Sequence, residues 1–329
     1  MEPVRRACGA EAPATASGRR RAVIDVGTNS IKLLVADVSG RDVRPVHEES
    51  RQTRLGRGFY ETHRLQPEAV ACTAEAVWEF AQIARERNSD SIRVIATSAA
   101  RDAVNPGDLT SAIQRASDLK VEIISGEREA EWAFQGVTTD AELAKAPLLL
   151  LDVGGGSTEF ILGQGEHKHF ARSFPLGTVR LMEKFPHSDP PTRGEFNACR
   201  DWIRDFLENE VRPKLDPALR REARSSSGEI QLVGTGGTTS ILARIEAKLD
   251  RYDRERIEAT RLSLERVKSH RRRLWRLPLA ERKEIVGLPK LRADVILTGV
   301  VIYEMVMAEF GFQQLRVSTR GLRFAAVMD

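Results

Sequence analysis

The chain has 329 residues, of which 41% are hydrophobic and 30% are charged, and this composition is typical of a soluble globular protein. The length is too great for one ordinary core and predicts two domains of middling size. No apolar run reaches the ~20 residues that a membrane-spanning helix needs, and the first residues lack the apolar segment of a secretory signal. Three scattered cysteines exclude a disulfide framework, so we expect a cytoplasmic protein with no membrane partner.

The net charge of +4 is unevenly distributed along the chain. Five arginines and two glutamates place +3 in residues 1–21, so the remainder is almost neutral, which speaks against a nucleic-acid partner. Segment 251–276 is the exception, with ten Lys or Arg and four Asp or Glu, including Arg271, Arg272 and Arg273. This segment is either a solvated basic helix face or a binding strip for a long polyanion.

The first half of the chain predicts a hairpin followed by alternating helices and strands. Residues 1–20 are rich in Ala, Gly, Pro and Arg without periodicity and are expected to form a disordered arm. An apolar run then ends in Asp25, turns through residues 27–30 and continues as a strand at 31–36. Helices are expected at 67–87, at 106–116 and from Ser125, with strands at 92–96 and 121–124.

The second half begins by repeating the hairpin. A shift of 127 residues places Asp25 on Asp152, Gly27 on Gly154 and Ser30 on Ser157, which indicates two domains of one fold. Further elements are expected as follows: a helix at 193–211, a Ser/Gly linker at 225–228, a strand at 230–233, a glycine turn at 234–238, an apolar helix at 293–310, a strand at 315–317 and a short terminal helix. This alternation of strands and helices predicts the α/β class.

Three glycine turns follow apolar strands. Glycine lets consecutive backbone N–H groups converge on an anion, and neighbouring hydroxyls add donors. The turn of Gly154, Gly155, Gly156 and Ser157 lies between two acids and favours phosphate binding, whereas the turn with Gly236 and Gly237 fits a purely conformational role equally well. No GxxxxGK[ST] or GxGxxG motif is present, and the histidines show no ligand spacing, with His167 and His169 expected in a surface turn.

Acidic residues accompany these turns. Asp25, Asp152 and Glu159 flank the first two turns, where carboxylates could hold Mg²⁺, although Asp25 and Asp152 could instead cap the turns. Glu127, Glu129 and Glu131 fall in the first turns of the helix predicted from Ser125. Acids there often only complement the helix dipole, and the same dipole would tend to keep a general base ionised.

Five motifs in order make the chain resemble a known family: AVIDVGTNSIKLLVADV, ATSAARDAVN, EIISGEREAEWAFQGV, LLLDVGGGSTEFILG and LVGTGGTTSILA. From about Arg21 to its C-terminus the chain is similar to the exopolyphosphatase/guanosine pentaphosphatase family, within the acetate-kinase, sugar-kinase, chaperone and actin superfamily. Long family members carry a helical C-terminal module that is not found here, so the chain resembles the short two-domain form.

The resemblance implies roles for single residues. Glu129 matches the general base that activates water. Asp152 and Glu159 match the acids that organise metal and phosphate, with Asp25 as a further metal ligand. Arg101 matches an arginine that grips phosphate. The implied phosphate-binding residues also include both hairpin turns and the third turn: Gly27, Thr28, Asn29, Ser30, Gly154, Gly155, Gly156, Ser157, Gly236 and Gly237. Thr28 stands where the family usually has a serine.

The resemblance also implies a fold and an activity. The expected fold is two actin-like α/β domains around a cleft, at 21–135 plus about 313–329 and at 136–312. The expected activity is release of terminal orthophosphate from inorganic polyphosphate, of short chain length, by water attack with Mg²⁺ or substituting Mn²⁺, in a cytoplasmic homodimer. Guanosine pentaphosphate, a substrate of the stringent response, is an alternative. A second alternative is that the protein is a catalytically weak sensor that binds polyphosphate or an alarmone.

Overall fold

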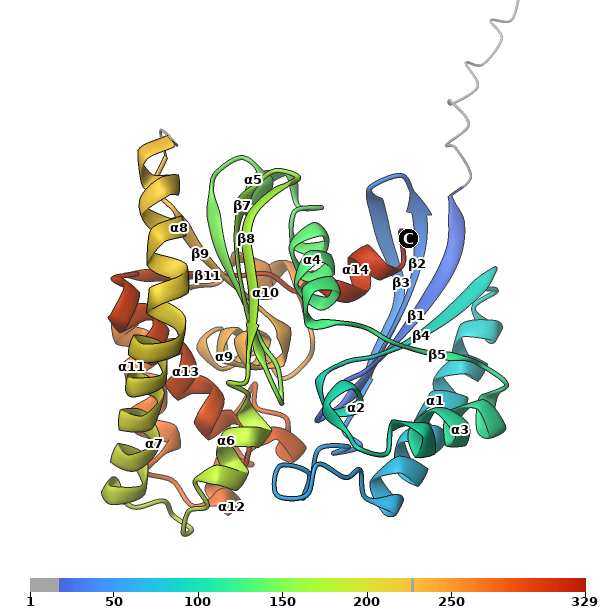
Figure 1. Ribbon diagram of the computed structural model, residues 1–329, viewed down its shortest axis with the longest axis horizontal. Helices are drawn as coiled ribbons and strands as arrows, with labels where there is room; N and C mark the ends of the chain where they lie inside the picture. The colour runs from blue at the N-terminus through green and yellow to red at the C-terminus, as the bar shows by residue number, and fades with distance from the viewer. Residues whose placement is uncertain (1–17, 226–227) are drawn as a thin grey trace, which may run out of the picture.

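Two α/β units lie side by side in the computed structural model, which describes residues 18–225 and 228–329 (Figure 1). One unit is built on a five-stranded sheet of order β3-β2-β1-β4-β5 and the other on a six-stranded sheet of order β10-β11-β9-β6-β7-β8. Residues 1–17 of the predicted arm and 226–227 of the predicted linker lie outside the described residues, whereas Arg19 and Arg20 already belong to β1. The predicted α/β class with two units is confirmed.

The first unit follows the order expected from the sequence. β1 and β2 form the predicted hairpin, and β1 pairs in parallel with β4. The helices α1 and α3 begin at prolines, which suit the first helical turn, and their buried faces cover this sheet. The bounds are β1 Arg19–Val26, β2 Ile31–Ser39, β3 Asp42–Arg51, α1 Pro67–Glu86, β4 Ser91–Ala96, α2 Ser98–Asp102, α3 Pro106–Ser117, β5 Val121–Ile123 and α4 Gly126–Val137.

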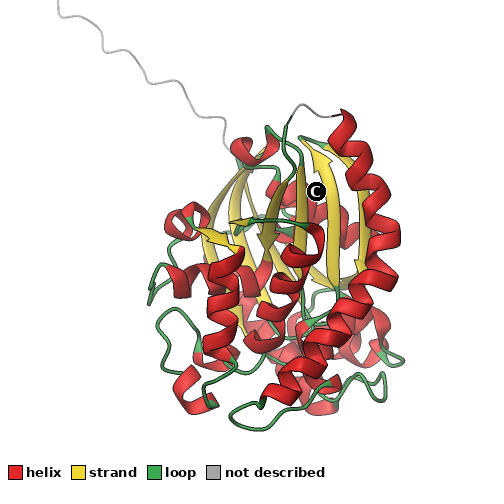
Figure 2. Ribbon diagram, turned by 90° about the vertical axis from the view of Figure 1, so that its left-hand side faces the viewer, coloured by secondary structure: helices red, strands yellow, loops and turns green. Residues whose placement is uncertain are grey.

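The second unit repeats the hairpin as β6 and β7 and places most of its helices on the outer face of its sheet (Figure 2). The elements that follow α4 along the chain are α5 Ala141–Ala144, β6 Leu148–Val153, β7 Thr158–Gln164, β8 His167–Phe174, α6 Thr178–Lys184, α7 Arg193–Phe206, a π-helical segment Leu207–Val211, α8 Arg212–Ser225, β9 Gln231–Thr235, α9 Gly236–Glu246, α10 Arg254–Ala259, β10 Arg261–Ser263, α11 Leu264–Leu274, α12 Leu279–Arg282, a 3₁₀ turn Lys290–Arg292, α13 Ile296–Phe310, β11 Gln314–Val317 and α14 Leu322–Ala326, of which all but α14 belong to the second unit.

Several elements differ from the sequence-based expectation. His167 and His169 lie on strand β8 rather than in a turn, because β8 pairs along β7 as a third antiparallel strand. The helix predicted at 193–211 continues through the π-helical segment into α8. The third glycine turn joins a strand to a helix, with Gly236 at a φ of 88°, unlike the first two turns, which join the strands of hairpins.

The C-terminal segment is divided between the two units, whereas we expected all of 313–329 to return to the first. β11 pairs in parallel with β9, Leu315 beside Leu232, because its apolar residues complete the core of the second sheet. Only α14 packs on the first sheet, where Phe324 joins Val23 and Trp132 in one cluster. Helices α4 and α14 contact each other between the two sheets and so connect the two units (Figure 1).

Within the described residues, no helix combines the length and the apolar character that crossing a membrane would require.

Candidate active site

The two glycine hairpins have the same backbone geometry and meet between the units. Gly27 N–H donates to the Ser30 carbonyl at 3.1 Å, and Gly154 N–H donates to the Ser157 carbonyl at 2.9 Å. The hairpins approach so closely that a Cβ added to Gly155 would lie 2.9 Å from Thr28 Cβ. Real Cβ atoms do not come that near, so this contact requires glycine at position 155.

A single cavity lies between these hairpins and collects most of the residues proposed from sequence. The predicted residues that line it are Asp25, Gly27, Thr28, Asn29, Ser30, Glu129, Asp152, Gly154, Gly155, Gly156, Ser157, Glu159 and Gly237. Two predicted residues are not among its lining. Arg101 contacts the cavity-lining Glu129 by a hydrogen bond, and Gly236 lines an adjoining second cavity.

Glu129 lies at the wall of the cavity on the first turns of α4. Ser125 begins this helix by accepting a hydrogen bond from Arg128 N–H at 3.1 Å. The Glu129 side chain is buried, with the residue 8% exposed, and its Oε2 accepts a hydrogen bond from Arg101 Nη1 at 2.9 Å. Arg101 Nη1 also donates to the Ile124 carbonyl at 3.2 Å, which fixes the guanidinium. Arg101 therefore orients Glu129, and its contact with phosphate, which the resemblance implies, stays a prediction.

Burial raises the pKa of Glu129 to about 7, although Arg101 opposes this shift. The expectation that the helix N-terminus would keep Glu129 ionised is thus outweighed by desolvation. A carboxyl group with a pKa near neutrality is well matched to accept and release a proton, because a general base works best when its pKa lies near the operating pH.

Three acidic residues, Asp25, Asp152 and Glu159, line the same cavity. Burial raises the pKa of all three carboxyl groups, and Glu159 is raised well above its usual range with further contributions from Glu129 and Asp152. Ser173 Oγ donates to Glu159 Oε1 at 2.7 Å. So many buried acids in one place disfavour their joint ionisation unless cations are present.

Two half-buried cations that the sequence reasoning missed also line the cavity. Lys32 lies opposite Asp25 in the hairpin register, and burial lowers its pKa. Arg292 belongs to the second unit, and its Nη2 donates to Ser30 Oγ of the first unit at 3.1 Å. Burial lowers the pKa of Arg292 to about 10. The internal repeat could have identified Lys32, since a shift of 127 residues places it on Glu159. No local pattern marks Arg292.

The carboxylates suit a magnesium ion bound together with substrate. Asp25 lines the cavity, and its Oδ1 is buried and has no hydrogen-bond partner, so this oxygen is available as a ligand. Among the residues the structure describes, no three His, Cys, Asp or Glu side chains form a ready metal cage. Mg²⁺ does not need such a cage, because one or two carboxylates with substrate phosphates and water are its usual ligands.

The basic segment 251–276 does not form a continuous free strip. Arg271, on α11, donates to the buried Glu304 through Nε at 2.7 Å and Nη2 at 3.0 Å, and its guanidinium lies 4.4 Å from the Phe196 ring centroid. Helix α11 packs on α13 at the outer edge of the second unit (Figure 1). Arg271 is thus part of the core packing there.

Known proteins match this chain over most of its length. The sequence model of the Ppx/GppA phosphatase family matches residues 34–328. Exopolyphosphatase 2 of Mycobacterium tuberculosis is 36% identical over 315 residues, which cover 91% of this chain and 94% of that protein.

Solved structures agree with these matches. An exopolyphosphatase from Cytophaga hutchinsonii has a TM-score of 0.82 at 28% identity and covers 93% of this chain and 96% of that one. The Ppx/GppA family member of Aquifex aeolicus has a TM-score of 0.74 at 28% identity, with 94% and 96% covered. The family and the actin-like fold class expected from the motifs are thereby confirmed: this chain is an enzyme that belongs to the Ppx/GppA phosphatase family.

Proposed function

We propose that the protein is an exopolyphosphatase that releases orthophosphate from the end of inorganic polyphosphate. The observation that carries the proposal is a buried Glu129, held by Arg101, at the wall of a cavity that both glycine hairpins line. Backbone N–H groups of consecutive glycines are suited to phosphate oxygens, and Glu129 is the base for water. Similarity to exopolyphosphatase 2 of Mycobacterium tuberculosis supports the same substrate class.

In the proposed reaction the terminal phosphate lies between the two hairpins. Arg101 engages Glu129 Oε2, so Oε1 is left to orient a water molecule and to accept its proton as the water attacks phosphorus in line with the leaving oxygen. Lys32 and Arg292 offset the charge that develops on the phosphoryl oxygens. Since the transition state of phosphoryl transfer is loose, positioning and electrostatics contribute more than basicity.

Asp25, Asp152 and Glu159 are the residues that would hold Mg²⁺, with Mn²⁺ as a substitute. When bound, the ion would neutralise phosphate charge and polarise the P–O bond that breaks. It would also relieve the repulsion among these three carboxylates.

Guanosine pentaphosphate is the second candidate substrate. Tyr252 is 50% exposed and lines the second cavity, which adjoins the first, so an aromatic ring is available to a nucleobase there.

Phosphate release from tripolyphosphate, long polyphosphate and guanosine pentaphosphate, each with and without Mg²⁺, tests both candidates. We expect release from polyphosphate, dependent on Mg²⁺, with kcat/KM rising with pH through about 7 as Glu129 loses its proton. Release from guanosine pentaphosphate alone would replace the first candidate by the second. Binding of polyphosphate without any release would support a sensor.

A further inference from the structure

A second cavity continues from the first and extends the proposed path of the substrate; the inference below rests on the proposed function. The two cavities share Asp25, Ser30, Lys32, Asp152 and Arg292 among their lining residues. Glu129 and Glu159 line only the first cavity. With its terminal phosphate at Glu129, a polyphosphate chain would pass Lys32 and Arg292 and extend into the second cavity.

Cationic residues in the lining of the second cavity favour the binding of a polyanion. Arg244 and Arg323 line it in addition to Lys32 and Arg292. Arg244 Nε is buried without a hydrogen-bond partner, so it remains available to a phosphate oxygen. Four cationic side chains along one cavity attract a chain that carries about one negative charge per phosphate.

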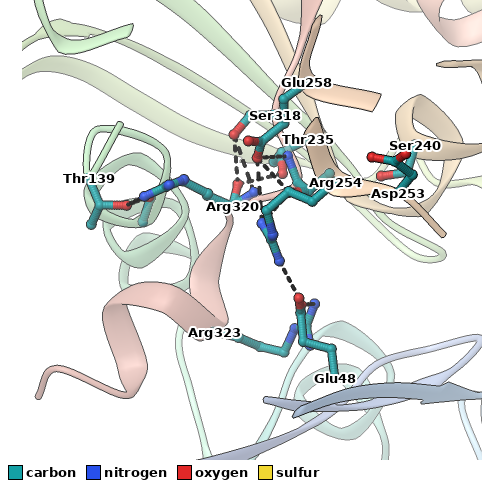
Figure 3. A network of polar contacts seen from close by, with 12 residues as sticks. Glu48, Thr139, Thr235, Ser240, Asp253, Arg254, Glu258, Ser318, Arg320 and Arg323 are labelled. Carbon is teal, nitrogen blue, oxygen red and sulfur yellow. Dashed lines mark hydrogen bonds and ion pairs between the residues drawn. The ribbon is translucent and has the colours of Figure 1, made fainter. Parts of the chain in front are cut away.

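Glu48 and Glu49, on strand β3, oppose this attraction from the first unit. Glu48 lies between two arginines of the C-terminal half (Figure 3). Its Oε1 accepts a hydrogen bond from Arg254 Nη2, and its Oε2 accepts one from Arg323 Nη2 at 3.3 Å. The side chains of Glu48 and Arg254 are each 19% exposed, so this ion pair is only partly screened by solvent.

Arg254 is further held by residues of the second unit. Its guanidinium donates to Thr319 Oγ1. It also lies 3.5 Å from a carboxylate oxygen of Glu258 (Figure 3). Thr319 lies in the segment between β11 and α14, and it also lines the second cavity. At the wall of the path, Glu48 thus occupies Arg323, which lines the second cavity, and is itself held by Arg254, which is not part of the lining.

We propose that Glu48 is a specificity-determining residue that disfavours long polyphosphate. Its carboxylate, held in place by Arg254, repels the phosphates that extend beyond Lys32 and Arg292, and it withholds Arg323 from them. Both effects act only on chains long enough to reach this part of the second cavity. Glu48 therefore affects how well polyphosphates of different length bind, and not the reaction at the terminal phosphate.

Steady-state kinetics of Glu48→Gln and Arg254→Gln test the proposal. Glu48→Gln removes the charge while keeping an oxygen for Arg254, and we expect it to lower KM for long polyphosphate by about fivefold, the size of a partly screened charge interaction. Arg254→Gln leaves Glu48 without one of its two cations, and we expect it to raise KM for long polyphosphate. The change should be smallest for tripolyphosphate, and kcat should stay nearly constant, which marks altered uniform binding.

Glu255→Gln is the matched control, since Glu255 is exposed on α10 and changes the net charge equally. Glu49→Gln is a second test that leaves the contact of Glu48 with Arg254 intact, and it should lower KM for long chains to a smaller degree. A readout without turnover is the affinity of long polyphosphate for Glu129→Gln and for Glu129→Gln/Glu48→Gln, which should be higher in the double variant.

A purely structural role for the Glu48–Arg254 contact predicts a different pattern. Both single variants would then shift KM in the same direction, equally for tripolyphosphate and long chains, together with a lower melting temperature. That pattern would overturn the inference and leave the proposed activity standing. No phosphate release by the wild type from any polyphosphate would instead refute the proposed function itself.

Discussion

The two glycine hairpins differ at one decisive position although their backbones match. Both begin with an aspartate, the buried Asp25 and the half-buried Asp152, and both close the turn with a backbone hydrogen bond to a serine carbonyl. The residue opposite the aspartate is Lys32 in the first hairpin and Glu159 in the second. One hairpin thus presents an acid and a base to the cavity, and the other presents two acids.

This difference suggests that the two hairpins have different tasks. The first hairpin pairs a cation with its aspartate and is suited to bind phosphate directly. The second carries two carboxylates beside Glu129 and is suited to a metal ion and the attacking water. The side chain opposite the aspartate therefore lets two hairpins of one strand-turn-strand form serve different sides of one reaction.

The largest effect is expected for Glu129→Gln, which tests whether the second hairpin is the side of the attacking water. Loss of the general base should lower kcat by about 10²–10⁴-fold, while polyphosphate binding remains measurable by titration. Glu127→Gln, exposed on the first turn of the same helix, is the control and should stay near wild type. A Glu129→Gln enzyme within about threefold of wild type, far below that range, would exclude Glu129 from the mechanism.

Lys32→Gln tests the assignment of phosphate binding to the first hairpin. Removal of a charged donor from a buried contact costs about 1.5–3 kcal/mol, so kcat/KM for tripolyphosphate should fall by about 10–100-fold. The Mg²⁺ concentration for half activity should change little. If Lys32→Gln alters only the Mg²⁺ titration, the division of tasks between the hairpins is wrong.

Asp152→Asn should change the Mg²⁺ dependence of the reaction, which Lys32→Gln should leave nearly unchanged. Loss of one carboxylate charge should raise the Mg²⁺ concentration for half activity by about tenfold, measured by phosphate release across a Mg²⁺ titration. Asp25→Asn should do the same if Asp25 Oδ1 is a ligand, and Asp205→Asn, exposed on α7, should not. An unchanged titration for Asp152→Asn would indicate that Asp152 only caps the turn.

The smallest effect on activity is expected on the basic helix α11, which lies outside both hairpins. Arg272→Ser and Arg273→Ser should leave KM for long polyphosphate unchanged at low salt. Arg271→Ser should instead lower the free energy of unfolding by about 3–5 kcal/mol, because Glu304 would be buried without its partner. A raised KM for long chains in the Arg272→Ser/Arg273→Ser variant would instead indicate that the basic segment binds polyphosphate.

Much of the fold followed from local patterns in the sequence. The helices α1 and α3 begin at their prolines as expected, and the hairpins form where apolar runs flank glycine turns. Strand β3 escaped notice because most of its residues are polar, and β8 because its first residues resemble a turn. The C-terminal strand was assigned to the wrong sheet because its apolar residues do not show which neighbour they will pair with.

The sequence by itself determined the two hairpins, the acids beside them and the glutamate at the start of α4, because each depends on residues that are neighbours in the chain. Only the tertiary structure decided that Arg101 holds Glu129, that Arg292 reaches Ser30 and that Glu48 occupies Arg254. These pairs join segments distant in the chain, and they exist because the packing of α4 and α14 brings the two sheets together. Burial between the sheets then sets the pKa of Glu129, which no local pattern encodes.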